Sequence, residues 1–324
     1  MQLTFAPMEG VTTACFRRIH AECFPGADRY YAPFLAPDGS GKVKISVLRE
    51  LAPEKNPGFD LIPQILCNRP EAFLGLAREL ASMGYGEVNL NAGCPSATVV
   101  PKHKGAGMLL DLRSLDEFLD QIYSACPVKV SVKTRLGLES AEEFPVILEI
   151  YNKYPLAELI VHARDRAGMY QSTPDLSAYA FAFSHSRAPV CYNGNVLDRT
   201  SYNTVLAAVP ETGRIMLGRG AAANPALFRI LRGGSRLESK ELRGFLDRLC
   251  AAYTEDGLPD YYLLGRMKEL WYYVNHMFPG AQRELKQLNK ARTLSDYHTA
   301  VELLFASGRF NSEATFPGAI PKVF

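Results

Sequence analysis

Two residues that could take part in catalysis lie at or just after the ends of short apolar runs. Cys94 lies in a loop between Gly93 and Pro95, and His162 ends the run Leu159-Ile160-Val161. Free cysteines are usually buried hydrophobic residues, but a loop cysteine beside a reaction site can act as an acid or a nucleophile. A lone histidine at the end of an apolar run, such as His162, is more often a satisfied core residue than a catalyst. Cys94 alone therefore selects no single reaction.

Lys133 projects from the run Val-Lys-Val-Ser-Val-Lys-Thr-Arg, which ends at Arg135. Strand alternation puts Lys133 and Arg135 on the same face. A lysine inside a closed sheet is unfavourable unless it meets an anion, although an exposed strand end is the simpler alternative. Gln64, an amide within an apolar run, could bond to the backbone or read the edge of a flat heterocycle.

Two glycine-rich turns follow later runs, at Asn193-Gly194-Asn195 and Gly218-Arg219-Gly220. Such turns expose backbone N–H groups next to a helix N-terminus, which is a typical phosphate site. Either turn alone could simply be tight, but the pair on consecutive strands favours phosphate, with Arg219 adding charge. Lys102-His103-Lys104 precedes Gly105-Ala106-Gly107, and this basic loop is either a lid over an anionic substrate or a solvated surface loop.

The elements that must position these residues are short strands alternating with helices. This alternation predicts a (β/α)8 TIM barrel, in which catalytic groups gather at the carboxyl ends of the strands. The alternative, a doubly wound open sheet, should have Gly-x-Gly-x-x-Gly after its first strand, where this chain has Pro7-Met8-Glu9-Gly10. The predicted strands are Leu3–Ala6, Arg29–Ala32, Leu61–Leu66, Glu87–Asn91, Val128–Thr134, Glu158–His162, Ala188–Tyr192 and Arg214–Gly218.

The alternation stops near Arg232, and Gly233-Gly234-Ser235 reads as a linker. Helical patterns follow, so we predict a barrel domain over 1–232, a small helical domain over 238–308 and an extended tail over 309–324. The predicted helices are Ser239–Asp256, Leu263–Phe278, Ala281–Asn289 and Ser295–Phe305.

Composition limits the class of protein. The chain has 324 residues, is 47% hydrophobic and 22% charged, and carries a net charge of +2, which excludes a disordered or fibrous protein. No run approaches the roughly 20 apolar residues of a membrane helix, and the N-terminus lacks a signal-peptide pattern. Seven scattered cysteines without a Cys-x-x-Cys pair argue against a disulfide framework or a zinc ribbon. We expect a cytoplasmic protein with no metal site, no membrane association and no obligate protein partner.

Phosphate at the last two strands and a flat ring near strands 1, 3 and 5 would suit FMN. A lysine beside the ring, such as Lys133, would stabilise the negative charge of the reduced flavin. From the residues alone, the prediction is an FMN-type barrel with a cysteine at its rim.

The motifs together resemble those of the tRNA-dihydrouridine synthases, in order along the whole chain. The matching segments are Ala6-Pro7-Met8-Glu9-Gly10-Val11-Thr12 with Phe16-Arg17, Asn91-Ala92-Gly93-Cys94-Pro95-Ser96, Val132-Lys133-Thr134-Arg135, Val161-His162-Ala163-Arg164, Asn193-Gly194-Asn195-Val196, and Leu217-Gly218-Arg219-Gly220 with Asn224-Pro225.

The resemblance implies an FMN-bound barrel and a helical domain that helps to hold tRNA. The implied reaction reduces the uracil C5–C6 double bond by hydride transfer from FMN to C6, with NADPH as the transient reductant of the flavin. Cys94 would protonate C5 as the general acid, and Asn91 and Arg135 would lie near the uracil. The implied FMN-binding residues are Pro7, Met8 and Glu9 beside the ring, Gln64, Lys133 and His162 at its polar edge, and Asn193, Gly194, Asn195, Gly218 and Arg219 around the phosphate.

Basic residues would contact the tRNA. Arg283, Lys286 and Lys290 share one helix face at i, i+3 and i+7, a pattern that a merely solvated face would also show. Arg266 and Lys268 flank the preceding helix, and Lys102 and Lys104 lie in the basic loop. This chain has Ala32-Pro33 where members of the resembled family often carry an acidic residue, and Ala97 where they usually carry lysine. Lys102 and Lys104 would compensate for the missing lysine.

Three other interpretations stay open at this stage. The first is an FMN-dependent reductase or dehydrogenase of a free pyrimidine or small enone, which would not need the helical domain. The second is a non-catalytic RNA-binding protein, which would not need Cys94 or Lys133. The third is a phosphate-sugar enzyme without a flavin.

Overall fold

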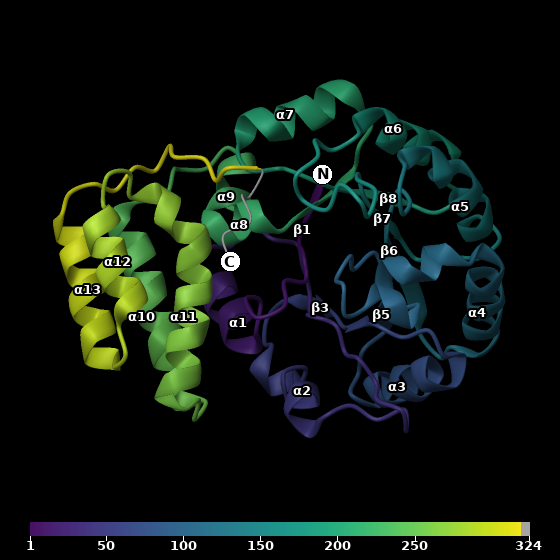
Figure 1. Ribbon diagram of the computed structural model, residues 1–324, viewed down its shortest axis with the longest axis horizontal. Helices are drawn as coiled ribbons and strands as arrows, with labels where there is room; N and C mark the ends of the chain where they lie inside the picture. The colour runs from purple at the N-terminus through teal and green to yellow at the C-terminus, as the bar shows by residue number, and fades with distance from the viewer. Residues whose placement is uncertain (319–324) are drawn as a thin grey trace.

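The computed structural model describes residues 1–318 and contains a parallel barrel beside a bundle of helices (Figure 1). All the strand pairs are parallel, in the order β3-β2-β1-β9-β8-β7-β6-β5-β4. The strands are β1 (Gln2–Phe5), β2 (Arg29–Tyr31), β3 (Asp60–Ile62), β4 (Gln64–Ile65), β5 (Glu87–Ala92), β6 (Lys129–Arg135), β7 (Leu159–His162), β8 (Val190–Asn193) and β9 (Arg214–Leu217). The predicted TIM barrel is therefore confirmed.

The third predicted strand is divided by Pro63 into β3 and β4. β3 pairs with β2, and β4 pairs with β5, so this one stretch of chain closes the barrel. Proline has no N–H to give to a ladder, but its carbonyl still accepts from the N–H of Asn89 at 2.8 Å. The prediction of an unbroken strand over Leu61–Leu66 was wrong at this residue.

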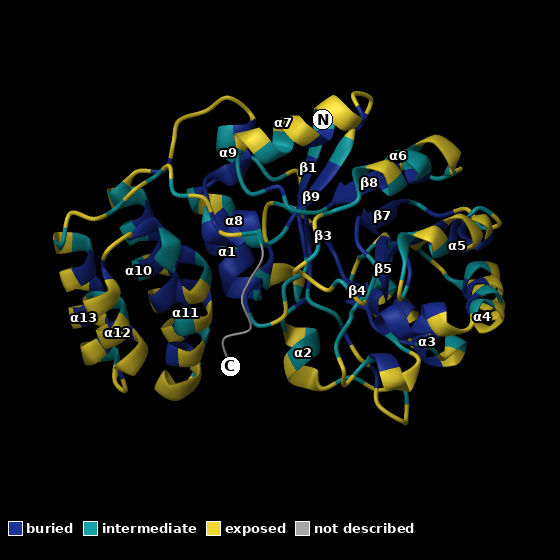
Figure 2. Ribbon diagram, turned by 45° about the horizontal axis from the view of Figure 1, so that its top comes forward, coloured by how far each residue is buried: buried dark blue, intermediate teal, exposed yellow. Residues whose placement is uncertain are grey.

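Helices cover the outside of the barrel, and their buried faces pack against the strands (Figure 2). Gly84 follows α3 with φ of +96°, a left-handed conformation that glycine adopts readily just after a helix. The helices along the barrel are α1 (Ala14–Cys23), α2 (Ile45–Arg49), α3 (Pro70–Ser82), α4 (Leu112–Ala125), α5 (Phe144–Tyr151), α6 (Leu176–His185), α7 (Arg199–Ala208), α8 (Arg219–Ala223) and α9 (Leu227–Leu231).

The helical bundle lies to one side of the barrel (Figure 1). Its helices begin close to the predicted positions because their apolar residues recur at helical spacing. They are α10 (Ser239–Glu255), α11 (Asp260–Val274), α12 (Gln282–Lys290) and α13 (Leu294–Ala306). Residues 309–318 of the predicted tail contain no helix or strand, and residues 319–324 lie outside the described part of the chain.

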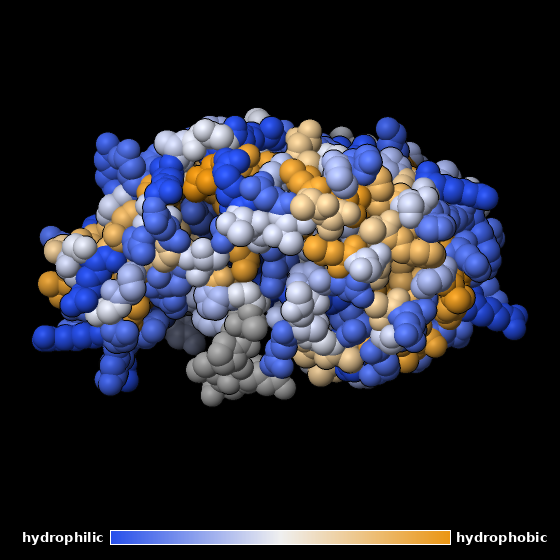
Figure 3. All heavy atoms as spheres, turned by 90° about the horizontal axis from the view of Figure 1, so that it is seen from above, coloured by the Kyte–Doolittle hydropathy of each residue, from blue (hydrophilic) through white to orange (hydrophobic). Residues whose placement is uncertain are grey.

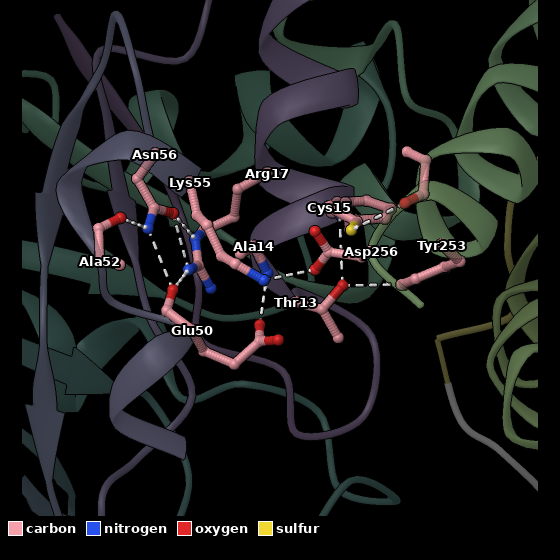
Figure 4. A network of polar contacts seen from close by, with 12 residues as sticks. Thr13, Ala14, Cys15, Arg17, Glu50, Ala52, Lys55, Asn56, Tyr253 and Asp256 are labelled. Atoms are coloured by element: carbon pink, nitrogen blue, oxygen red, sulfur yellow. Dashed lines mark hydrogen bonds and ion pairs between the residues drawn. The ribbon is translucent and has the colours of Figure 1, made fainter. Parts of the chain in front are cut away.

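The bundle is attached to the barrel through α1 and the segment after α2 (Figure 4). The hydroxyls of Thr13 and Tyr253 lie 2.8 Å apart, and Lys55 Nζ contacts Asp256 at 2.6 Å. Phe16 of α1 packs edge-on against Phe245 of α10 with ring centroids 5.8 Å apart. The two parts of the chain therefore share both an apolar and a polar contact.

The barrel interior contains a small apolar layer between two polar ends. Its members are Ala6, Tyr31, Ile62, Ile160, Cys191 and Met216. Among residues 1–318, no helix has the length and hydropathy required to cross a membrane.

Candidate active site

A cavity of about 350 Å³ opens at the carboxyl ends of the strands. Because all the strands are parallel, their carboxyl ends meet at one mouth of the barrel. Most of the residues predicted for the flavin and uracil sites line this cavity. These are Pro7, Met8, Glu9, Gln64, Asn91, Cys94, Lys133, Arg135, His162, Asn193, Gly194, Gly218 and Arg219.

Cys94 is half-buried in a loop that folds back on itself. Its backbone N–H donates to Asn91 Oδ1 at 2.9 Å, and its carbonyl accepts from the N–H of Ala106 at 3.0 Å. Gly105 has φ of +57°, and a Cβ there would lie 2.8 Å from the Cβ of Cys94. Only glycine fits so closely in this conformation, so the backbone on both sides holds the thiol in place.

A chain of side-chain amides crosses the barrel below Cys94. Asn91 Nδ2 donates to Gln64 Oε1 at 2.8 Å, and Gln64 Nε2 donates to Asn89 Oδ1 at the same distance. Asn89 Nδ2 then donates to Ser131 Oγ at 3.0 Å. These bonds fix which way each amide points, so Gln64 and Asn91 present defined polar atoms at the cavity floor.

Cationic side chains surround the cavity without acidic partners. Among the described residues, none of Lys133, Arg135, Arg164 and Arg219 forms an ion pair. Burial, reinforced by Arg135, lowers the pKa of Lys133 to about 7. The site therefore favours the binding of an anion.

His162 is a neutral imidazole in this environment. Burial and the neighbouring cations, Arg135 first among them, hold the pKa of His162 well below its usual range. Arg164 Nη1 donates to His162 Nε2 at 3.1 Å. Since a guanidinium can only donate, Nε2 is the acceptor and Nδ1 carries the proton.

Two guanidinium nitrogens near the cavity are buried and have no hydrogen-bond partner among the described residues. They are Arg164 Nη2 and Arg219 Nη1. The other nitrogens of Arg164 are occupied, since Nε donates to the Ser172 carbonyl at 2.6 Å. A buried unsatisfied donor is costly, so both atoms point to a ligand oxygen.

The glycine turns leave space beside these arginines. A Cβ at Gly194 would collide with the hydroxyl of Tyr192, and a Cβ at Gly218 would point towards Met8 Sδ, 3.7 Å away. Asn195 does not line the cavity, but its Oδ1 accepts from Arg219 Nη2 at 2.7 Å.

Arg135 binds the backbone of two loops. Its Nε donates to the Gly93 carbonyl at 2.9 Å, and its Nη1 donates to the carbonyls of Asp165 and Met169 at 2.7 and 3.0 Å. This arginine therefore holds the cysteine loop to the loop that follows β7, while its side chain also lines the cavity.

Two tyrosines in the cavity wall were not predicted. Tyr170 stacks under the guanidinium of Arg219 at 4.7 Å from its ring centroid and under that of Arg135 at 5.5 Å. Tyr273 comes from α11 of the bundle, so the bundle contributes to the cavity. Pro33 and Phe34, after β2, also line it.

The predicted tRNA contacts lie outside this cavity. Lys102 is exposed and Lys104 is half-buried. Arg266 Nη1 donates to the Gly10 carbonyl at 3.0 Å, and Lys268 Nζ donates to the Ala291 carbonyl at 2.6 Å. Arg283, Lys286 and Lys290 are exposed on α12, which belongs to the end of the molecule where hydrophilic side chains project in Figure 3.

Two further hollows are present. One of about 520 Å³ lies at the opposite end of the barrel, where its arginine is paired with carboxylates. The other, of about 600 Å³, lies between barrel and bundle and shares Glu9, Pro33 and Phe34 with the mouth cavity. Lys44, Arg49 and Arg266 line it, so it forms a polar extension of the mouth.

The sequence is similar to those of known proteins. The family model of dihydrouridine synthase (Dus) matches residues 4–312. A "probable tRNA-dihydrouridine synthase" of Staphylococcus epidermidis is 31% identical over 252 residues, covering 74% of each chain. The "tRNA-dihydrouridine(16) synthase" of Shigella flexneri is 25% identical over 320 residues, covering 94% of this chain and 98% of its own.

The fold is also similar to a solved structure outside that family. Morphinone reductase, in complex with tetrahydroNAD, aligns with a TM-score of 0.52 at 12% identity, over 73% of this chain and 87% of its own. This likeness concerns the barrel fold alone.

Proposed function

The chain belongs to the dihydrouridine synthase family, and we propose that it is an oxidoreductase that reduces the C5–C6 double bond of a uridine in tRNA. The observation that carries this proposal is the mouth cavity. It combines a thiol on a firmly held loop with unpaired cations and ordered amides. Free pyrimidine reduction is the alternative that the experiment below must separate from it.

FMN is the resident cofactor in this proposal. Its phosphate would meet the unsatisfied nitrogens of Arg164 and Arg219 beside Gly194 and Gly218, with Asn193 and Asn195 in support. The ring would lie near Pro7, Met8 and Glu9, with Gln64, Lys133 and neutral His162 at its polar edge. Bound FMN would supply hydride for uracil C6, and NADPH would replace that hydride after each turnover.

Lys133 and Cys94 would control charge and protons. An anion bound next to Lys133 would raise its pKa above the value of about 7 and favour the charged ammonium. Cys94 Sγ would donate the proton that uracil C5 requires, as general acid. Negative charge on Cys94 raises the pKa values of Lys133 and Arg135, so these two cations would stabilise the resulting thiolate.

The RNA would approach through the mouth. A uridine flipped out of its stack can enter such a cavity at modest cost, with Asn91 and Arg135 near the base. The adjoining hollow with Lys44, Arg49 and Arg266 would take neighbouring backbone phosphates. We propose that residues 1–232 are the FMN-binding catalytic domain and 238–308 the tRNA-binding domain, with Lys102, Lys104 and the α12 row as outer contacts. Lys268 is left out of this set because its ammonium is bonded to the Ala291 carbonyl. A tRNA substrate is consistent with a cytoplasmic enzyme.

The test is mass analysis of tRNA that lacks dihydrouridine, after incubation with the purified protein, FMN and NADPH. We expect one uridine to gain two hydrogens, and position 16 is the first to map because the full-length relatives are named for it. If tRNA stays unchanged while the protein oxidises NADPH in the presence of free uracil, the substrate is a small pyrimidine instead.

The Cys94→Ala variant tests the proposed acid. We expect turnover to fall by about 10²- to 10⁴-fold while FMN stays bound, because only the proton donor is removed. Cys126→Ala is the matched control, since Cys126 is also a half-buried free thiol but does not line the cavity. A Cys94→Ala variant with an unchanged rate would exclude Cys94 from the mechanism.

A further inference from the structure

The end of the described chain crosses from the bundle back to the barrel. After α13 it follows the yellow path of Figure 1 towards the barrel. The N–H of Asn311 donates to the Met277 carbonyl at 2.8 Å, and His276 Nε2 lies 3.0 Å from the carbonyl oxygen of Ala314. Thr315 Oγ1 then donates to Asp198 Oδ2 of the barrel at 3.2 Å. Residues 311–318, called the strap below, therefore touch both parts of the molecule.

Phe316 is the buried anchor of the strap. It is 5% exposed although its neighbours in the chain are largely open to solvent. Its ring packs against Tyr273 at a centroid distance of 5.6 Å and against His276 at 5.7 Å. Because Tyr273 lines the mouth cavity, Phe316 supports that wall from behind.

The strap also touches the adjoining part of this wall, where α8 packs on α11. A Cβ at Gly318 would lie only 2.7 Å from Asn195 Nδ2, so the strap packs closely on that side chain. Asn195 in turn accepts from Arg219, whose guanidinium lies over Tyr170. One short segment thus contacts two neighbouring parts of the cavity wall, Tyr273 directly and Arg219 through Asn195.

These contacts lie almost wholly beyond the family match, which ends at residue 312. Thr315, Phe316 and Gly318 follow the last residue that the family model matches. They add a connection between α11 and the turn after β8.

We propose that the strap fixes the wall formed by Tyr273 and by Asn195 with Arg219, and that Phe316 is a positioning residue that acts through Tyr273. The effect on KM rests on the proposed function, because that wall would face the incoming RNA. When Phe316 is removed, Tyr273 loses its packing partner and the cavity accepts substrate less well. Chemistry at Cys94, on the far loop, is preserved.

The first experiment measures amide hydrogen exchange by mass spectrometry on full-length Phe316→Ala. We expect faster exchange in peptides covering 194–222 and 266–278, with other regions unchanged. Phe310→Ala is the matched control, because Phe310 packs on Phe278 of the bundle at 5.7 Å and not on Tyr273. Exchange that rises equally in both variants, or only across the bundle, would overturn the proposal.

The second experiment is steady-state kinetics on tRNA. We expect Phe316→Ala to raise KM about five- to tenfold with kcat within about twofold, and Phe316→Leu to restore most of the loss. In a Tyr273→Ala background the same substitution should change KM by less than about twofold. An undiminished effect there would show that Phe316 does not act through Tyr273. If the wild-type protein forms no dihydrouridine, the proposed function fails, and hydrogen exchange still decides the role of the strap.

Discussion

The two ends of the barrel treat buried charge in opposite ways. At the amino ends of the strands, Arg214 Nη1 contacts Glu158 at 2.9 Å, and the hydroxyl of Tyr31 donates to the same carboxylate at 2.7 Å. Arg29 contacts both Asp60 at 2.6 Å and Glu87 at 3.3 Å. Each arginine here has a carboxylate from another strand.

At the mouth, Lys133, Arg164 and Arg219 form no ion pair within the described part of the chain, and two guanidinium nitrogens are unsatisfied. At the amino ends Glu87 Oε1 is also unsatisfied, but that carboxylate is paired with Arg29 through Oε2. A buried charge paired within the chain holds strands together, whereas an unpaired one lowers stability until a ligand arrives. The comparison indicates that the amino ends of the strands, called the barrel floor below, are built for stability and the mouth for binding. It yields four predictions.

The largest expected effect is on the free energy of unfolding, when an ion pair at the barrel floor is broken. Glu158→Ala leaves Arg214 and Tyr31 without their acceptor, so we expect the free energy of unfolding to fall by about 3 kcal/mol in urea titrations. Asp60→Ala is the control and should cost no more than about 1 kcal/mol, since the Asp60 side chain is 50% exposed. FMN affinity of the folded protein should not change in either variant, and a loss of affinity would contradict the division between floor and mouth.

The next effect is on ligand affinity at the mouth. Arg164→Met removes a charged donor, and we expect FMN affinity to fall by about 10- to 100-fold in fluorescence titrations. Thermal stability of the apoprotein should change much less than in Glu158→Ala. Unchanged FMN affinity would mean that the unsatisfied nitrogen of Arg164 serves another ligand.

Replacing Lys133 should raise the stability of the apoprotein, whereas replacing Glu158 should lower it. The pKa of Lys133 is about 7 in the folded protein, against an ordinary 10.5, so between these pH values the unfolded chain binds more protons. Apoprotein stability should therefore rise with pH through this window. Lys133→Met should flatten that rise and stabilise the apoprotein at pH 6 by on the order of 1–3 kcal/mol, while weakening FMN binding. A variant that is less stable at pH 6 would contradict an unpaired lysine.

The smallest expected effect is on tRNA affinity, when one lysine is removed from the exposed row Arg283, Lys286 and Lys290 on α12. Lys286→Ala should weaken tRNA binding about fivefold at low salt and reduce the salt slope by about 1, because one phosphate contact is lost. Lys268→Met is the matched comparison, since its ammonium is bonded to the Ala291 carbonyl, and it should lower stability with little change in slope. An unchanged slope for Lys286→Ala would identify the row as a solvated face.

Much of the site could be predicted because parallel strands bring their ends together. Once the strand ending at Arg135 and the one ending at His162 were recognised, neighbouring positions at the mouth followed from topology alone. Cys94 and the two glycine turns were found for the same reason. Pro63 was missed as a break because a proline inside an apolar run leaves the hydrophobic pattern intact.

Tyr170 and Tyr273 could not be predicted by that route. Tyr170 follows Met169, which has a φ of +48° in the loop after β7. No pattern of residue types in the sequence predicts this backbone turn. Tyr273 depends on how α11 sits against the barrel, which is a long-range contact. The hydrogen bonds of Arg135 could not be predicted either. Strand alternation predicts the face of the sheet on which a side chain lies, but not the atoms that a long side chain reaches.

Arg135 has a consequence for how this molecule can diverge. The three hydrogen bonds that its Nε and Nη1 donate go to main-chain carbonyls, at Gly93, Asp165 and Met169. Main-chain acceptors survive most replacements of the side chains around them, so the two loops can accumulate changes without losing the spacing between them. The bonds of Arg135 therefore separate the geometry of the site from its specificity. Tyr170 and its neighbours can change to suit a new substrate while the cysteine loop keeps its position.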